Sequence, residues 1–283
     1  MTQLGGQKAP ERPERVGFLP DYNQAMGGLV VLSPHLDDAV FSCGGWMAQR
    51  ASAGDEVRVL TICAGDPPAG PLSSFAEQLH LRWGTAVAPA SVRRTEDRIA
   101  AGRLGALARH LDIPDAIYRT AENGTPLYPD ESAIFGALHT EDSRIVEYLG
   151  DLLSQACDAS TQVVCPLAVG GHVDHQLTRG AAERLGLGLW YYYDLPYASR
   201  GGGLPAGFSM PAGEVVSLPL AHEEIEAWAS AAAEYRSQIG SFWSDADHLL
   251  SELIELHDAW GGARLLLAHG SHPYGQALGP LAL

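Results

Sequence analysis

The sequence has few basic residues and no long hydrophobic run. Its 18 lysines and arginines face 34 aspartates and glutamates, which gives a formal net charge of −16. Nucleic acids and anionic membrane surfaces attract basic patches, so this balance argues against both as partners. No apolar stretch approaches the roughly 20 residues that a membrane-spanning helix needs. We therefore expect no nucleic-acid partner and no membrane span.

Cysteine and glycine signatures are also absent. The four cysteines, at positions 43, 63, 157 and 165, show no CxxC spacing, so a reduced interior is expected. The polar first 17 residues lack the apolar segment of a signal peptide. Both features favour a cytoplasmic location. The phosphate-binding patterns GxGxxG and GxxxxGK[ST] do not occur, which argues against a simple nucleotide-binding protein.

The order of apolar segments predicts an α/β protein. Residues 28–35 and 56–65 have the short, β-branched pattern of strands, and a helical pattern lies between them. This β-α-β order is typical of a parallel sheet with right-handed crossovers. We predict one domain over residues 28–283, preceded by an arm or loop at 1–27. Further strands are expected at 116–119, 161–169, 189–197 and 214–220, and helices at 93–111, 144–157 and 223–239.

Two of the predicted strands end in clusters of histidine and aspartate. HLDD at 35–38 follows the first strand, and HVDH at 172–175 follows the strand at 161–169. Ligands bind beyond the carboxyl ends of strands in open parallel sheets, so the two clusters can meet there. Either cluster alone has a structural explanation, as a helix N-cap or as a hydrogen-bonded buried histidine. Together they favour a site for Zn²⁺, which imidazole and carboxylate bind well.

The spacing within the clusters suggests a role for each side chain. We predict His35, Asp38 and His175 as the metal ligands. Asp37 lies too close to Asp38 to be an idle anion, and it is the expected general base toward a water activated by the metal. His172 is then expected on the opposite side of the site from Asp37, as a proton donor or as a hydrogen-bond partner of the oxyanion.

The two clusters resemble the motifs of the PIG-L/LmbE family of metal-dependent N-deacetylases. The family motif (P/A)HPDDE is present as PHLDDA at 34–39, and the motif HPDH or HxxH as HVDH at 172–175. Weaker resemblances to the family are RRTEDRIAAGRLG, which lies between the two motifs, and YYYDLPY and EYRSQI, which come after them. The likeness covers roughly residues 28–240.

The resemblance implies a Rossmann-like, three-layer α/β/α fold with a mostly parallel sheet. It implies a catalytic Zn²⁺ and the hydrolysis of an N-acyl group, usually acetyl, from a glucosamine-type sugar. It matches the roles predicted above: His35, Asp38 and His175 bind the metal, Asp37 is the base and His172 assists the tetrahedral intermediate. It also places Arg94, ahead of Arg93, at the sugar. Asp194, near the end of the strand at 189–197, is a further candidate for substrate binding.

The sequence departs from the family pattern at three positions. Leu36 replaces a proline, Ala39 replaces a glutamate, and Gly170 stands where some members carry a tyrosine that can assist the oxyanion. A long loop with a short helix around SFAEQLHLRWG is expected at 66–92. Because substrate loops vary most among such proteins, the sequence does not identify the group attached to the sugar. Two alternatives remain: an amidase for a sugar-thiol conjugate or natural-product glycoside, and a non-catalytic sugar-binding protein with a structural metal. Another divalent metal and a homo-oligomer are also left open.

Overall fold

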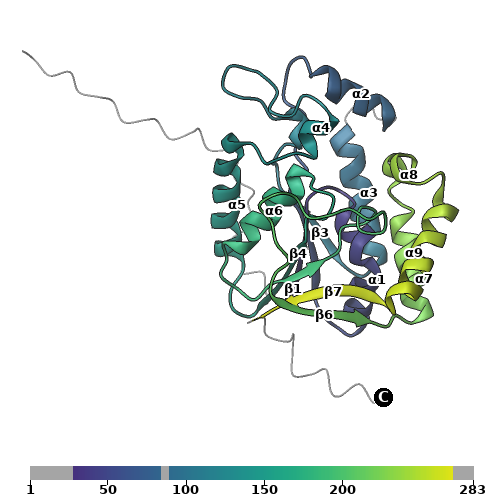
Figure 1. The fold of residues 1–283 in the computed structure, drawn as a ribbon. Coiled ribbons are helices and arrows are strands. Elements are labelled where there is room, and N and C mark those ends of the chain that lie inside the picture. Colours follow the sequence, from purple (N-terminus) through teal and green to yellow (C-terminus); the bar gives the residue numbers. More distant parts are fainter. Residues whose placement is uncertain (1–27, 84–88, 270–283) are drawn as a thin grey trace, which may run out of the picture.

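A twisted seven-stranded sheet forms the centre of the computed structural model, which describes residues 28–83 and 89–269 (Figure 1). The strand order is β3-β2-β1-β4-β5-β7-β6. The first five strands pair in parallel, and β7 pairs antiparallel with both β5 and β6. The strands are β1 Gly28–Ser33, β2 Val57–Thr61, β3 Leu107–His110, β4 Thr161–Pro166, β5 Trp190–Tyr192, β6 Gly213–Leu218 and β7 Ala263–Ala268.

Helices cover both faces of this sheet, and two separate apolar clusters lie between the layers (Figure 1). One face carries α1 Asp38–Ser52, α3 Pro89–Arg103, α7 His222–Ala232, α8 Arg236–Phe242 and α9 Ala246–Trp260. The other face carries α5 Ser143–Ala156 and α6 Val173–Glu183. This arrangement confirms the predicted α/β/α fold with a mostly parallel sheet. The predicted arm at 1–27 lies outside the described residues.

Short elements close over the sheet edge where β1 and β4 end. They are α2 Ser74–Arg82, the 3₁₀ turns η1 Ala116–Tyr118 and η2 Thr140–Asp142, and α4 Glu131–Ile134. A third apolar cluster joins α2, η1 and α4 to Val173 at the start of α6. The expected loop at 66–92 therefore holds a packed helix, which forms part of the wall around this edge.

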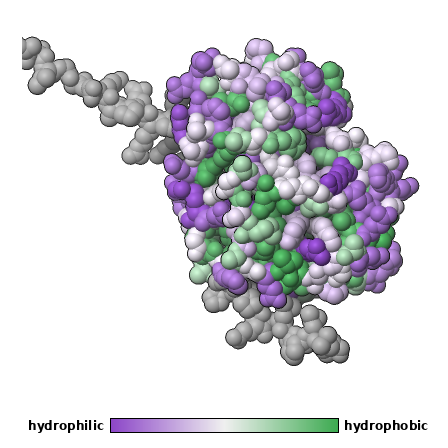
Figure 2. Space-filling view, viewed as in Figure 1, coloured by the Kyte–Doolittle hydropathy of each residue, from purple (hydrophilic) through white to green (hydrophobic). Residues whose placement is uncertain are grey.

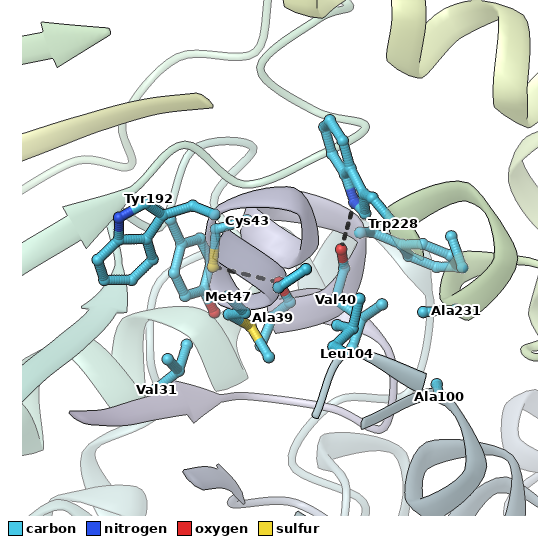
Figure 3. Close-up of a cluster of buried hydrophobic side chains, with 14 of the residues drawn as sticks. Val31, Ala39, Val40, Cys43, Met47, Ala100, Leu104, Tyr192, Trp228 and Ala231 are labelled. Atoms are coloured by element: carbon cyan, nitrogen blue, oxygen red, sulfur yellow. Dashed lines mark hydrogen bonds between the residues drawn. The ribbon is translucent and has the colours of Figure 1, made fainter. Parts of the chain in front are cut away.

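The paired glycines of α1 allow another helix to pack closely against it. A Cβ atom on Gly44 would lie 2.5 Å from Trp228 Cδ1, and one on Gly45 would lie 2.5 Å from Leu220 Cδ1. The Trp228 indole donates to the Val40 carbonyl at 2.7 Å, which joins α7 to α1 (Figure 3). This contact holds α1, which begins at the last aspartate of HLDD, against α7 within one buried apolar cluster.

Several predicted elements differ from the structure. The helix predicted at 93–111 ends at Arg103, because Gly105 adopts φ +73° and turns the chain into β3. Leu107, which falls within that predicted helix, lies instead on the edge strand β3 and is 54% exposed. Residues 116–119 were predicted as a strand but contain η1, and α9 and β7 had no predicted counterpart.

Among the described residues, no helix combines the length and the apolar character needed to cross a membrane. The face in Figure 2 carries hydrophobic residues toward its middle and hydrophilic residues along its sides. This face of the protein is therefore mixed in hydropathy.

Candidate metal centre and active site

The chain bends sharply after β1, and this bend brings His35 and Asp38 together. Ser33 Oγ donates to the His35 carbonyl at 2.6 Å and accepts the Ala39 N–H at 3.0 Å. The His35 N–H donates to Asp38 Oδ2 at 2.7 Å. The same carboxylate oxygen lies 3.1 Å from His35 Nδ1. The HLDD sequence therefore forms a closed turn with both side chains facing the sheet edge.

The second cluster begins α6 beside this turn, because β4 is the parallel neighbour of β1. Gly170 and Gly171 adopt φ +90° and +80°, which most other residues avoid, and they turn the chain into the helix. His172 is the N-cap residue, and its Nδ1 accepts the Asp174 N–H at 3.2 Å. His175 Nε2 lies 3.3 Å from Asp38 Oδ2. The two predicted clusters thus meet, although they are more than 130 residues apart.

The three predicted metal ligands provide a donor set that suits a divalent cation. Asp38 Oδ2 lies within 3.3 Å of one ring nitrogen each of His35 and His175. His175 Nε2 is buried and has no hydrogen-bond partner among the described residues. A buried imidazole nitrogen without a partner is expected where a metal binds. Two further sets of atoms lie within 4.8 Å of one another: His35, His172 and His175, and His35, Asp115 and Asp174.

Each candidate histidine ligand has a buried aspartate on its other ring nitrogen. His35 Nε2 lies 3.0 Å from Asp174 Oδ2, and His175 Nδ1 lies 2.6 Å from Asp194 Oδ1. Such carboxylates orient a ligating imidazole and fix its tautomer. This places His35 Nδ1 and His175 Nε2 toward the candidate metal position. Asp194 was predicted to bind substrate, but it is fully buried beneath His175 and does not line the cavity.

Asp37 lines the same cavity as His35 and Asp38, and it faces a cation. Its nearest ionic partner is Arg93, whose NH2 lies 3.6 Å from Asp37 Oδ2. Burial and the adjacent Asp38 charge raise the pKa of Asp37 to about 7, against the lowering effect of Arg93. Asp37 has the N-cap position of α1 but makes no capping hydrogen bond. Its carboxylate therefore remains available to a molecule in the cavity.

His172 is held as a neutral imidazole. Burial lowers its pKa well below the ordinary value, and the neighbouring His35 adds to this effect. Because Nδ1 accepts the Asp174 N–H, the proton of the neutral ring resides on Nε2. His172 lines the same cavity as Asp37. The ring can therefore donate one hydrogen bond to a molecule bound there.

The cavity has a polar floor and a wall of mixed character. His35, Asp37, Asp38, Asp115 and His172 form the floor, and polar groups of the wall come from Arg82, Arg93, Glu131, Gln238 and Ser241. The surrounding wall comes mainly from α2, η1, α4 and α8, and its apolar members are Phe75, Leu79, Trp83, Ile117, Ile134, Phe135 and Phe242. This composition suits a ligand with one polar reacting group and an apolar portion.

The two adjacent arginines of α3 differ in position. Arg93 is buried, lines the cavity and lies over the Trp83 ring at 5.0 Å. Arg94, the preferred candidate from the sequence, does not line it; its guanidinium donates to the Ala64 carbonyl at 2.7 Å and to Asp66 at 2.8 Å. A helix turns by about 100° per residue, so neighbours cannot both face the cavity.

Three residues of the site were given no role from the sequence. Asp174 is part of the HVDH cluster, and its position in that motif was the available signal. Asp115 and Arg119 flank η1 after β3, in a segment whose sequence pattern predicted a strand instead. Arg119 NH1 lies 2.6 Å from Asp174 Oδ1, and Asp115 Oδ2 lies 3.8 Å from His35 Nε2. Only the folded chain brings them to the clusters.

Tyr197 occupies the space that a side chain at position 170 would need. A Cβ atom on Gly170 would lie 2.5 Å from Tyr197 Cγ. The Tyr197 ring lines the cavity and contacts His175, with 5.9 Å between ring centroids. A tyrosine therefore does reach this part of the site, from the segment after β5.

Comparisons with known proteins agree with this arrangement. The PIG-L family model, described as GlcNAc-PI de-N-acetylase, matches residues 30–185. The 2'-N-acetylparomamine deacetylase of Niallia circulans is 30% identical over 195 residues, and the match covers 62% of this chain and 69% of the relative. The Streptomyces fradiae enzyme of the same name is 31% identical over 180 residues, and the match spans 62% of this chain but only 59% of that relative.

A solved structure shares the fold over most of its length. It is the zinc-inhibited form of the teicoplanin deacetylase Orf2, with 27% sequence identity and a TM-score of 0.69. The match covers 86% of this chain and 99% of that one. The similarity therefore extends well beyond the two histidine-aspartate clusters.

Proposed function

Because this chain belongs to the PIG-L family and is accordingly a deacetylase, we propose that it hydrolyses the N-acetyl group of an amino sugar carried by a larger molecule. The products are acetate and the free amine. The observation that carries this proposal is the placement of Asp37. The Asp37 carboxylate makes no capping hydrogen bond to α1 and lines the cavity. It lies next to the candidate ligand set of His35, Asp38 and His175.

His35, Asp38 and His175 are the residues that would hold a divalent cation, Zn²⁺ by the chemistry of its ligands. When bound there, such a cation would lower the pKa of water and polarise the amide carbonyl. Asp174 and Asp194 keep the two imidazoles in their required orientations. The remaining chemistry falls to Asp37 and His172.

Asp37 acts as the general base and then as the acid. It accepts a proton from water as the water oxygen bonds to the amide carbon. His172 donates the hydrogen bond of Nε2–H to the oxygen that becomes negatively charged. The protonated Asp37 returns its proton to the amine nitrogen as the C–N bond breaks. One water is consumed, and the base returns to its starting state.

The apolar part of the wall favours a natural-product glycoside over a free sugar. Phe75, Trp83 and Phe135 offer aromatic surface close to the polar floor, whereas a monosaccharide presents mainly hydroxyl groups. The curated relatives are named for an acetylated paromamine, and the structural relative for teicoplanin. Both names belong to natural products that contain an amino sugar, which supports a substrate in which the sugar is part of a larger molecule.

The experiment that tests this proposal is Asp37→Asn, with zinc content and acetate release measured on the same preparation. We expect zinc occupancy to be retained and turnover to fall by roughly 10²–10⁴-fold, the range of general acid-base catalysis. Near-normal turnover would remove the base assignment. His175→Ala is the matched comparison, because it should lose zinc as well as activity.

The same measurements separate this enzyme from the alternatives. A sugar-binding protein with a structural metal would bind acetylated glycosides without releasing acetate in any condition. An amidase for a sugar-thiol conjugate would release a different acid and would leave simple N-acetylglucosaminides intact. A panel of N-acetylated glycosides that differ in the attached group, assayed together with a sugar-thiol amide, therefore distinguishes all three.

A further inference from the structure

Helix α8 forms one side of the cavity and is tied to α3 at its first turn. Three of its residues line the cavity: Gln238, Ser241 and Phe242. Their spacing of i, i+3 and i+4 puts them on one face of the helix. Glu96 of α3 accepts the Ser237 N–H at 3.0 Å. The side of α8 that faces the cavity is therefore held in place from a neighbouring helix.

A chain of three side chains runs from α3 to the cavity. The Ser237 hydroxyl donates to Glu96 Oε2 at 2.6 Å. Because a carboxylate can only accept hydrogen bonds, the single hydroxyl proton of Ser237 is directed to Glu96. Ser237 Oγ can then only accept, and it accepts from Gln238 Nε2 at 3.0 Å. The Glu96 carboxylate thus sets the direction of both hydrogen bonds.

This direction determines which end of the Gln238 amide is left for a ligand. Nε2 is directed at Ser237, so the carbonyl oxygen Oε1 lies on the other branch of the amide. Among the described residues, Oε1 accepts no hydrogen bond. The Gln238 side chain is only 3% exposed and lines the cavity, so a partner can reach it from there. A buried acceptor without a partner costs free energy until a donor binds it.

We propose that Glu96 is a positioning residue for substrate recognition: through Ser237 it orients Gln238 to accept a hydrogen bond from a hydroxyl group of the substrate sugar. This inference rests on the proposed deacetylation of an amino sugar. A sugar hydroxyl can donate to Gln238 Oε1, whereas an ether or ester oxygen at the same position cannot. The contact is made equally in the bound substrate and in the transition state. It therefore contributes to binding and not to the chemical step.

The main test is Glu96→Gln, which keeps the size of the side chain but replaces its charge with an amide. The introduced amide can donate to Ser237 Oγ, so that the hydroxyl proton turns to Gln238 and the amide of Gln238 presents its donor end to the cavity. We expect KM for a phenyl N-acetylglucosaminide to rise by about 3–10-fold, the effect of one neutral hydrogen bond, while kcat stays within about twofold. Zinc content should be unchanged.

Two further variants separate the orientation of Gln238 from the support of α8. Ser237→Ala removes the hydroxyl but keeps the N–H that α8 donates to Glu96, and it should raise KM to a similar extent. Ser237→Thr retains a hydroxyl and should keep KM near that of the unmodified protein. Glu234→Gln is the control, because this carboxylate pairs with Arg103 and does not line the cavity. Unaltered KM in Glu96→Gln and Ser237→Ala, or a loss confined to kcat, would overturn the role of Glu96.

Binding of deoxy analogues tests the same contact without turnover. The Asp37→Asn protein is titrated by calorimetry with the phenyl glycoside and with analogues that each lack one hydroxyl group of the sugar. One analogue should bind about 3–10-fold more weakly, and adding Gln238→Ala or Glu96→Gln should cause no further loss for that analogue alone. Further loss for every analogue would contradict the contact. Absence of acetate release by the unmodified protein would instead reject the proposed function, and the titrations would still judge Glu96.

Discussion

The two candidate metal-binding histidines have similar partners but different surroundings. Behind His35, Asp174 also contacts the Arg119 guanidinium at 2.6 Å. Behind His175, Asp194 accepts the Val169 N–H at 2.9 Å and has no arginine or lysine within 4.0 Å among the described residues. Both carboxylates accept a backbone N–H, Asp174 from Ala116 at 3.0 Å and Asp194 from Val169, but only Asp174 also has an ion pair with an arginine.

The pKa directions of the two aspartates follow this difference. Burial alone would raise the pKa of Asp174, but the charges of Arg119 and His35 hold it far below the ordinary value. Burial raises the pKa of Asp194, and its hydrogen bond to His175 only partly opposes this. The comparison teaches that the same orienting contact can be reinforced by a charge network at one histidine and be made without such a network at the other.

Removing the cation of the network is expected to have the largest effect. Arg119 also lies 3.0 Å from Asp142, so Arg119→Met leaves two buried carboxylates without their partner. We expect the free energy of unfolding to fall by about 3–5 kcal/mol, the cost of breaking a buried ion pair. Chemical denaturation measures it. A loss below about 1 kcal/mol would contradict the network, and Arg119→Lys should recover part of the stability.

Changing each aspartate to its neutral isostere compares the two orienting contacts directly. Asp174→Asn and Asp194→Asn should each weaken zinc binding by about 10–100-fold, the usual effect of altering a partner of a metal-bound histidine. Asp174→Asn should lie at the upper end, because it also leaves Arg119 with fewer anionic partners. Competition with a coloured chelator gives both affinities. Equal losses, or a larger one for Asp194→Asn, would show that the surrounding charge adds nothing.

The sequence predicted the parts of the site that adjoin strand ends. HLDD and HVDH each follow a strong strand pattern, and parallel pairing of β1 with β4 was enough to bring them together. Arg119 could not be predicted in this way. It ends the segment 116–119, which contains η1 instead of the predicted strand, and it meets Asp174 only in the folded protein. Asp194 was found as a polar residue near a strand end, but the sequence does not specify whether it faces the cavity or His175.

Two differences between the sequence predictions and the structure, a helix end and the arginine that lines the cavity, have related causes. The helix at 93–111 was extended too far, because its apolar residues keep helical spacing past Gly105, where the backbone turns. The choice of Arg94 over Arg93 depends on the rotation of α3 about its axis, which is set by packing of Ala100 and Ala101 against the core. Local patterns do not contain this information.

A smaller effect is expected from the far end of the network. Tyr128 is buried; its hydroxyl donates to Asp142 at 2.6 Å and accepts the His139 N–H at 2.8 Å. Tyr128→Phe leaves that N–H without its acceptor and should cost about 1–3 kcal/mol of unfolding free energy. Urea denaturation measures the change, with the exposed Tyr148→Phe as control. A neutral result would place Tyr128 outside the network that stabilises Asp174.

The smallest effect should come from an ion pair of the same chemistry at the surface. The Arg94 guanidinium lies 2.8 Å from Asp66, a shorter separation than that between Arg119 and Asp142. The Asp66 side chain is 65% exposed, however, so water solvates it whether or not the arginine is present. Arg94→Met should therefore change the free energy of unfolding by less than about 1 kcal/mol. Denaturation of Arg94→Met and Arg119→Met side by side tests whether burial, rather than distance, decides the contribution of an arginine. Equal losses would contradict that conclusion, because both substitutions remove the same guanidinium.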